Sequence, residues 1–372
     1  MNKRYRYDHS IRILCAVLFA IFSFVYIYVF QGELLALMQD YLSEGVTESN
    51  AFVAALIITL LLSLMQWGIN HVSKLHGRWE ALSYIPSCAL LALITDVNDG
   101  TMLYSASKWL WGVPLVVIVY IGVVWVNRMR RSVKRNGLFS LLYPNLMAFS
   151  LLFVLTAQIS NHAPAPHMEL AAWHYLHDDR YEDVLKVGKR SDDYNMELTA
   201  LRNLAMLKTG TLGERMFHYP QPFGADGLLC NRYNKQSIAY GAQEYYRHMG
   251  VEPYGGESGL AFAQRLHMKN DSVLYRDLYL AALLLEKKLD LFVEESSELA
   301  ESDTLPAHYQ EAWLLYNEKN PTLAVEFTPD SAIVKRFADY RSLQVEHTDN
   351  PIVSKNLSKR KFGNTYWYYF DY

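Results

Sequence analysis

Five apolar segments divide the first 160 residues of the chain. Four are nearly uninterrupted runs of 17 to 20 residues, about what an α-helix needs to cross a hydrocarbon core roughly 30 Å thick. The third is 15 residues long and contains Ser83, Pro86 and Ser87. Because a backbone in lipid must pair its polar groups internally, each segment is predicted to be helical. The predicted spans are 13–30, 51–67, 81–95, 109–126 and 138–157.

Basic residues occupy alternate loops between these segments. The amino-terminal tail and the loops after the second and fourth spans hold 11 Lys and Arg residues, whereas loops 31–50 and 96–108 hold only Lys108. Short basic loops stay in the cytoplasm, which places the amino terminus inside and everything after the fifth span outside. If the third span only dipped into the membrane, the basic cluster at 128–135 would lie outside, which the same rule disfavours.

The composition changes at residues 161–166, where two Pro residues form a short linker. We therefore predict a transmembrane domain over 1–160 and an extracytoplasmic domain over 161–372. The second domain has 23 basic and 30 acidic residues, a net charge of −7, which disfavours nucleic acid as a partner. Its one cysteine, Cys230, allows no internal disulfide, which is compatible with a bacterial periplasm.

Helical periodicity dominates residues 161–372. Apolar positions between 168 and 176 lie on one helix face, and so do those between 198 and 207. A turn follows each, at 178–180 and at Gly210, and a further apolar face begins after it. Asp179 and Gly210 are 31 residues apart, close to the roughly 34-residue period of tetratricopeptide repeats. The predicted fold is all-α: a five-helix transmembrane bundle followed by an irregular, tetratricopeptide-like helical-repeat domain.

Three passages carry a resemblance to a known family: HMELAAWHY at 167–175, LPAHYQEA at 305–312 and FGNTYWYYF at 362–370. In these the chain resembles a family of uncharacterised bacterial inner-membrane proteins with a multi-span amino-terminal part and a repeat-like helical tail. The resemblance implies this architecture and a location in the inner membrane of the cell envelope. It implies no activity.

Acidic residues in the two outer loops are the candidate catalytic groups: Asp40 and Glu44 in the first, Asp96 and Asp99 in the second. Membrane glycosyltransferases that use lipid-linked sugars place a carboxylate in an outer loop to activate the acceptor or to hold a metal. Outer loops also tolerate Asp and Glu for reasons of topology alone. Catalysis by these groups is therefore the alternative hypothesis.

His167, His174 and His177 are the candidate metal ligands, because positions i, i+7 and i+10 can share one helix face. A zinc site would need a further ligand from elsewhere. The ordinary interpretation, histidines at the surface and between helices of a repeat, is preferred. We predict no metal and no other cofactor.

Transport is disfavoured because the predicted spans contain no Asp, Glu, Lys, Arg or His. Gln66 and Asn145 are predicted to join helices. The function that we predict is a membrane-anchored scaffold whose helical-repeat domain binds protein or envelope-polymer partners. The alternative is a polytopic enzyme acting on lipid-linked glycans. Conserved outer-loop carboxylates among homologues would favour the enzyme, and conservation on one face of the repeats would favour the scaffold.

Five aromatic residues occupy positions 366–370. A disordered tail is poor in aromatics, so this segment is predicted to bury surface. We expect it to seal the last helical pair, as terminal repeats must cover an apolar face. The alternative is an anchor for a partner or for lipid headgroups.

The five-span topology makes a direct prediction. In a variant without native cysteines, Ser302→Cys should react with a membrane-impermeant thiol reagent in intact cells, and Ser132→Cys should not, because only the former would lie outside. Labelling of both introduced thiols, read by gel shift, would rule out this topology.

Overall fold

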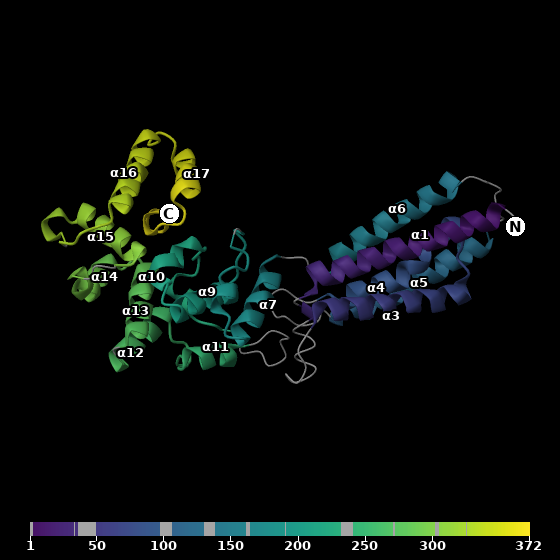
Figure 1. The fold of residues 1–372 in the computed structure, drawn as a ribbon, viewed down its shortest axis with the longest axis horizontal. Helices are drawn as coiled ribbons and strands as arrows, with labels where there is room; N and C mark the ends of the chain where they lie inside the picture. The colour runs from purple at the N-terminus through teal and green to yellow at the C-terminus, as the bar shows by residue number, and fades with distance from the viewer. Residues whose placement is uncertain are drawn as a thin grey trace. The chain divides into compact units, whose positions relative to one another are not determined.

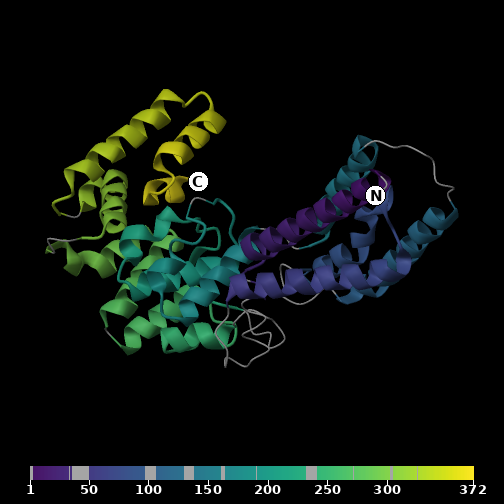
Figure 2. The ribbon, with the colours of Figure 1, turned by 45° about the vertical axis from the view of Figure 1, so that its right-hand side comes forward.

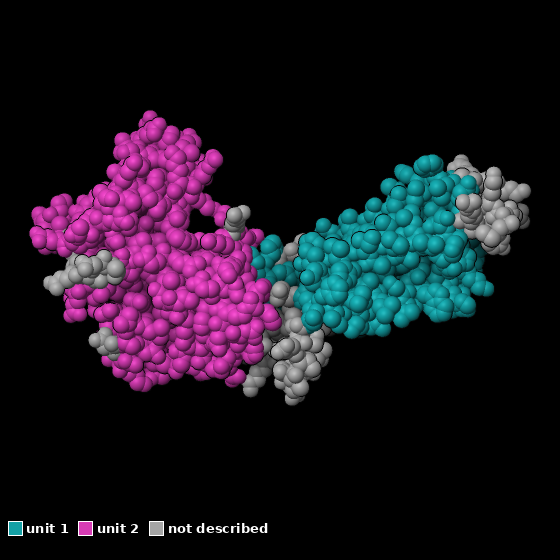
Figure 3. Space-filling view, viewed as in Figure 1, with its two compact units in different colours: residues 1–170, 234–239 teal, residues 171–233, 240–372 magenta. Residues whose placement is uncertain are grey.

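The computed structural model describes residues 3–32, 34–35, 50–96, 106–129, 138–160, 164–189, 191–231, 241–270, 272–301, 305–324 and 326–372. In these ranges the regular elements are all helices. The chain forms two compact units, the first ending at Leu170 and the second beginning at Ala171 (Figure 3). The predicted all-helical class is confirmed.

The first unit is built from long apolar helices (Figure 1). Its main elements are α1 (Lys3–Val25), continued by the π-helical turn η1 (Tyr26–Phe30), α3 (Ala51–Ser73), α4 (Ile85–Ile94), α5 (Ala106–Met129) and α6 (Leu138–Ile159). Four stretches are long and apolar enough to cross a membrane: Tyr7–Phe30, Ala51–Ser73, Lys108–Met129 and Leu138–Ile159. Each contains one of the predicted spans.

The third predicted span is not a continuous helix, which corrects the prediction for 81–95. Two short 3₁₀ turns, η2 (Gly77–Trp79) and η3 (Ala81–Tyr84), precede the ten-residue α4. Pro86 stands at the start of α4, where its missing N–H costs nothing, and it would break a helix that continued through it. This part of the chain is called the 77–95 segment below.

Side chains of the neighbouring helices form hydrogen bonds with the irregular 77–95 segment. Asn145 on α6 donates to the Gly77 carbonyl oxygen (2.7 Å) and accepts from the Ala81 amide (2.8 Å). Gln66 on α3 donates to the Ser83 hydroxyl (2.6 Å). The predicted role of Gln66 and Asn145 in joining helices is confirmed. Irregular backbone at membrane depth is tolerated only when it is buried and satisfied in this way.

Polar contacts also hold both ends of the segment. The Thr95 hydroxyl donates to the Ser160 hydroxyl beyond the end of α6 (2.9 Å). At the other end the Glu80 carboxylate is almost fully buried, with Arg12 Nε at 3.5 Å and His76 Nδ1 at 3.7 Å. Glu80 lies one residue before the predicted span 81–95 and is therefore not one of the residues of that span.

The second unit consists of shorter helices (Figures 1 and 2). Helix α7 (Pro164–His177) runs across the boundary and leads into it. The following helices are α8 (Tyr181–Val184), α9 (Met196–Lys208), α10 (Leu212–Arg215), α11 (Ala242–Met249), α12 (Gly259–Lys269), α13 (Val273–Leu285), α14 (Leu289–Ser296), α15 (Ala307–Lys319), α16 (Ser331–Glu346), α17 (Pro351–Phe362) and α18 (Tyr366–Asp371). Short 3₁₀ turns lie at Met216–His218, Gly224–Leu228, Ser297–Glu301 and Pro321–Leu323.

One turn geometry recurs three times in this unit, after α7, α9 and α13. The residue at its centre has a left-handed backbone, with φ of 58° at Asp179, 65° at Gly210 and 55° at Lys287. The next amide donates to a carbonyl five residues earlier at 2.9 Å each time: Arg180 to Tyr175, Thr211 to Met206, and Lys288 to Leu283. This Schellman pattern ends one helix and starts the next. The predicted turns at 178–180 and Gly210 are confirmed.

Helices α16 and α17 form a hairpin at one edge of the unit (Figures 1 and 2). The short α18 then packs against α15 and α17. The carboxyl-terminal helix therefore returns to the body of the unit.

Replacing Asn145 should destabilise the first unit. Asn145→Ala leaves the Gly77 carbonyl and the Ala81 amide unpaired in an apolar setting, a loss of about 2 kcal/mol or more. We expect the melting temperature of the full-length chain in detergent to fall by several degrees. Ser150→Ala, on the exposed face of the same helix, is the control. Equal melting of the two variants would contradict the role given to Asn145.

Candidate functional site

Of the four predicted outer-loop carboxylates, only Asp96 lies within the described residues. Asp40, Glu44 and Asp99 lie outside the described residues. Asp96 is buried, its Oδ1 lies 2.6 Å from Lys108 Nζ, and its Oδ2 accepts from Trp109 Nε1 (2.6 Å). Since both of its oxygens have partners, Asp96 is held as an ion pair rather than presented to a substrate.

The three predicted histidines of α7 have separate surroundings. His174 packs beside Tyr175, with ring centroids 5.8 Å apart, and His177 Nδ1 lies 3.2 Å from Glu244 Oε1. In the part of the chain that the structure describes, no group of three or more His, Cys, Asp or Glu side chains is placed to hold a metal ion.

His177 instead belongs to a polar cluster that joins the end of α7 and the following turn to α11. We call it the α11 cluster, and its members are His177, Asp179, Tyr181, Glu244, Arg247 and His248. The turn supplies Asp179 because its left-handed backbone reverses the chain there. Helix α11 supplies the other half, because positions 244, 247 and 248 share one helix face.

His248 is the centre of the α11 cluster, and its side chain is only 3% exposed. Its Nε2 lies 3.3 Å from Glu244 Oε1 and 3.2 Å from Arg247 Nη2. Its Nδ1 lies 3.2 Å from the Tyr181 hydroxyl, which itself donates to Asp179 Oδ1 (2.7 Å). A neutral ring that donates from Nδ1 to the Tyr181 oxygen and accepts from Arg247 satisfies both nitrogens.

Electrostatics fix the protonation states in the α11 cluster. Burial, reinforced by the charge of Arg247, lowers the pKa of His248 and keeps its ring neutral. Burial opposes ionisation of Glu244, but hydrogen bonds from Arg247 and His177 outweigh it and lower the pKa of Glu244 to about 2. Burial and the bond to Asp179 raise the pKa of Tyr181 to about 12. The polar groups of the cluster are hydrogen-bonded to one another, and these bonds hold α11 against the end of α7 and the turn that follows it.

A second buried site joins two of the passages that carry the family resemblance. Glu311 Oε2 accepts from the Tyr366 amide (2.8 Å) and lies 2.9 Å from His308 Nδ1. The indole of Trp367 donates to the Glu311 carbonyl oxygen (2.8 Å). The side chains of Tyr366 and Trp367 are fully buried. One carboxylate on α15 therefore fixes the first turn of α18, at what we call the Glu311 junction.

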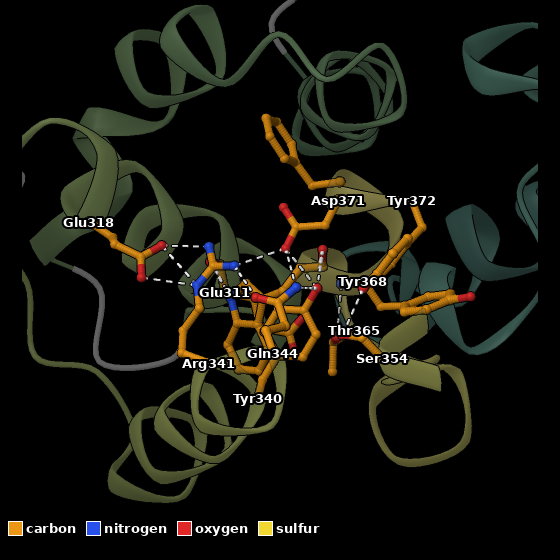
Figure 4. Close-up of polar contacts among 12 residues, drawn as sticks. Glu311, Glu318, Tyr340, Arg341, Gln344, Ser354, Thr365, Tyr368, Asp371 and Tyr372 are labelled. Atoms are coloured by element: carbon orange, nitrogen blue, oxygen red, sulfur yellow. Dashed lines mark hydrogen bonds and ion pairs between the residues drawn. The ribbon is translucent and has the colours of Figure 1, made fainter. Parts of the chain in front are cut away.

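Polar contacts also fix the end of α18 (Figure 4). Arg341 on α16 lies between two carboxylates, with its Nε 2.9 Å from Glu318 Oε1 and its Nη1 2.9 Å from Asp371 Oδ2. The Tyr340 hydroxyl donates to the same Asp371 oxygen (2.7 Å). The prediction that the aromatic carboxyl-terminal segment buries surface is confirmed, and its packing against α15 and α17 supports the sealing role.

Neither site was identified from the sequence. Each site does contain a pattern visible in the sequence, which is a His and a Glu one helical turn apart. The pairs are His308 with Glu311 and Glu244 with His248. The partners could not be found in this way, since Glu244 meets His177 across 67 residues of sequence and Tyr366 meets Glu311 across 55.

Comparison with known families gives one match. The model of a family of unknown function, DUF6057, matches residues 102–252 and 256–372, and the chain therefore belongs to that family. No curated protein and no solved structure matches. All three passages named in the sequence analysis lie within the matched residues.

The α11 cluster predicts a defined response to acid. Glu244 titrates at about 2 when folded, below the 4.5 of a free glutamate, so the unfolded chain binds protons first as the pH falls. The stability that Glu244 contributes is present above about pH 4.5 and is lost as the pH falls toward 2. Hydrogen exchange should show the amides of α11 losing protection between about pH 4.5 and pH 2. In the Glu244→Gln variant the amides of α11 should be less protected from exchange at pH 6, and their protection should fall less as the pH is lowered. If protection falls equally in the variant and in the unsubstituted chain, Glu244 does not stabilise the contact between α11 and α7.

Removal of α18 tests the sealing role. Truncation after Asn364 exposes the surfaces covered by Tyr366 and Trp367 and leaves Glu311 buried without the Tyr366 amide. We expect a loss of at least about 2 kcal/mol, and a melting temperature several degrees lower for the full chain in detergent. Tyr372→Ala, at the exposed end, should change little. Unchanged melting with loss of partner or membrane binding would favour the anchor instead.

Proposed function

We propose that this member of the DUF6057 family is a membrane-anchored binding protein. Its first unit is embedded in the bacterial inner membrane, and its second unit binds protein or envelope-polymer partners on the periplasmic side. The observation that carries the proposal is the recurring helix–turn–helix plan of the second unit, joined in one chain to four helices of membrane length. Stacked helix pairs are a frequent basis for extended binding surfaces.

The repeat interpretation rests on the three equivalent turns. Each one follows a helix of 13 or 14 residues, namely α7, α9 or α13, and leads into a shorter helix. The second helices, α8 and α10, have only four residues, and α14 has eight. We therefore propose a tetratricopeptide-like but irregular array, in which the first helices are uniform and the second helices vary.

The side of the membrane on which the second unit lies depends on a fifth crossing by the 77–95 segment. The segment contacts Asn145 at one end and Ser160 at the other. It therefore runs alongside at least 15 residues of α6. At 1.5 Å per residue that is about 22 Å, most of a hydrocarbon core. This supports a crossing, although the segment is not one continuous helix. With five crossings and basic loops inside, the second unit is periplasmic.

The enzymatic alternative, action on lipid-linked glycans, gains no support from the described candidate. Asp96 is buried, paired with Lys108 and bonded to Trp109, so its carboxylate is not exposed to an acceptor that it could activate. The other candidates, Asp40, Glu44 and Asp99, stay untested. We therefore keep binding as the proposed activity.

Photocross-linking in living cells tests the proposal. A photoreactive residue at Met268 on α12 or at Ile352 on α17, both highly exposed, should give adducts of defined mass with a periplasmic partner. The same residue at Leu110 on α5, equally exposed but on a membrane-length helix, is the control. The adducts should form again when the purified full-length chain and the identified partner are mixed.

Two results would contradict the proposal. One is the absence of adducts at several exposed positions of the second unit in cells that make the substituted chain in the same amount as the unsubstituted one. The other is a pattern in which Leu110 and Ile352 give the same adducts, since this would reflect random collision rather than a binding surface.

A further inference from the structure

A cavity that is widely open to solvent, with a volume of about 450 Å³, lies in the second unit where the turn after α13, the end of α15 and the carboxyl-terminal α18 meet. Its lining includes Lys287 and Lys288 from the turn, Lys319 from the last turn of α15, and Phe370. None of the sites described above uses it. Its volume lies within the range of small-molecule sites in proteins.

The lining of this cavity contains three lysines and one acidic residue, Asp290, and all four are exposed. Lys287 is fixed by its left-handed turn and donates from Nζ to the Phe370 carbonyl oxygen (2.9 Å). Lys319 Nζ lies 3.9 Å from the centroid of the Phe370 ring. Among the described residues, no ion pair is formed by Lys287, Lys288 or Lys319. The cavity is thus a positive site in an acidic domain.

Helix α14 adds to this positive potential. It begins at Leu289 in the cavity lining, and its N-cap is Lys288, whose side chain cannot accept a hydrogen bond from the first turn. The first amides of α14 therefore have no side-chain cap, and the positive end of the helix dipole lies beside the three lysines.

We propose that this cavity binds the phosphate group of a phosphorylated small molecule or polymer unit. The lining carries a net charge of about +2, which complements the charge of about −1.5 to −2 on a phosphate monoester. Lysine binds phosphate as a point charge, and an uncapped helix start adds amide donors. The cavity is larger than a phosphate, so the organic part of the ligand lies against Phe370. This names one ligand of the proposed binding protein and so rests on that function.

Calorimetric titration of the full-length chain in a non-ionic, phosphate-free detergent tests the proposal. The probes are inorganic phosphate, glycerol 1-phosphate and succinate, a dicarboxylate of similar charge. We expect saturable binding of both phosphates and weaker binding of succinate. Lys288→Gln and Lys319→Gln should each weaken phosphate binding about tenfold, because each removes one charged hydrogen bond.

Lys269→Gln is the matched control, since Lys269 is also exposed in the last turn of a helix, α12, but lies outside the cavity lining. It should bind phosphate like the unmodified chain. Tighter binding of glycerol 1-phosphate than of phosphate supports a phosphate ester as the ligand, and equal binding would contradict the contact of the organic part with Phe370.

Three results would overturn the proposal: no saturable binding of either phosphate, equal binding of succinate, or equal weakening by Lys269→Gln and Lys319→Gln. The titration contains no protein partner. A failure here therefore leaves the cross-linking result intact, and a failure of cross-linking leaves phosphate binding intact.

Discussion

The hydrogen bonds of Asn145 to the 77–95 segment are the interaction on which the rest of the account depends. An apolar helical unit can include irregular backbone only if every buried amide and carbonyl finds a partner. Asn145 supplies both kinds of partner, to Gly77 and to Ala81. With these bonds a segment interrupted by Pro86 can lie among long helices. Whether the segment crosses the membrane then decides on which side the second unit works.

The second unit relies on similar local solutions at its helix ends. Left-handed residues at Asp179, Gly210 and Lys287 end three long helices in the same way, and each shorter helix that follows starts from a fixed direction. Buried polar groups then fix two of the helices to their neighbours. The α11 cluster holds α11, and the Glu311 junction holds α18. In both places a carboxylate with little exposure to water is paired with donors that satisfy it, as a charge inside a protein requires.

Much of this architecture could be predicted from the sequence, because it depends on local patterns. Four apolar runs predicted the four membrane-length helices, and Gly210 predicted the end of α9. The prediction of a continuous helix for the third span was wrong because Pro86 and the serine-containing turns before it favour short 3₁₀ segments. Side chains that are distant in the sequence form hydrogen bonds with these segments.

The candidate sites were harder to predict because they depend on pairing across the fold. Position along α7 suggested that His177 shares a face with His167 and His174, but its carboxylate partner, Glu244, comes from α11. Asp96 looked like an exposed loop carboxylate until its contacts with Lys108 and Trp109 were visible. Aromatic content alone predicted that 366–370 is buried, yet it gave no indication that Glu311 is the anchor.

Our central proposal is that the second unit lies outside the cytoplasm because the 77–95 segment makes a fifth crossing. Fusions after Tyr372 to alkaline phosphatase, which is active only in the periplasm, and to green fluorescent protein, which fluoresces only when folded in the cytoplasm, test it most directly in a bacterial host. The account predicts an active phosphatase fusion and a dark fluorescent-protein fusion, made in equal amounts. An inactive phosphatase fusion with a bright fluorescent-protein fusion would mean an even number of crossings and would contradict the account.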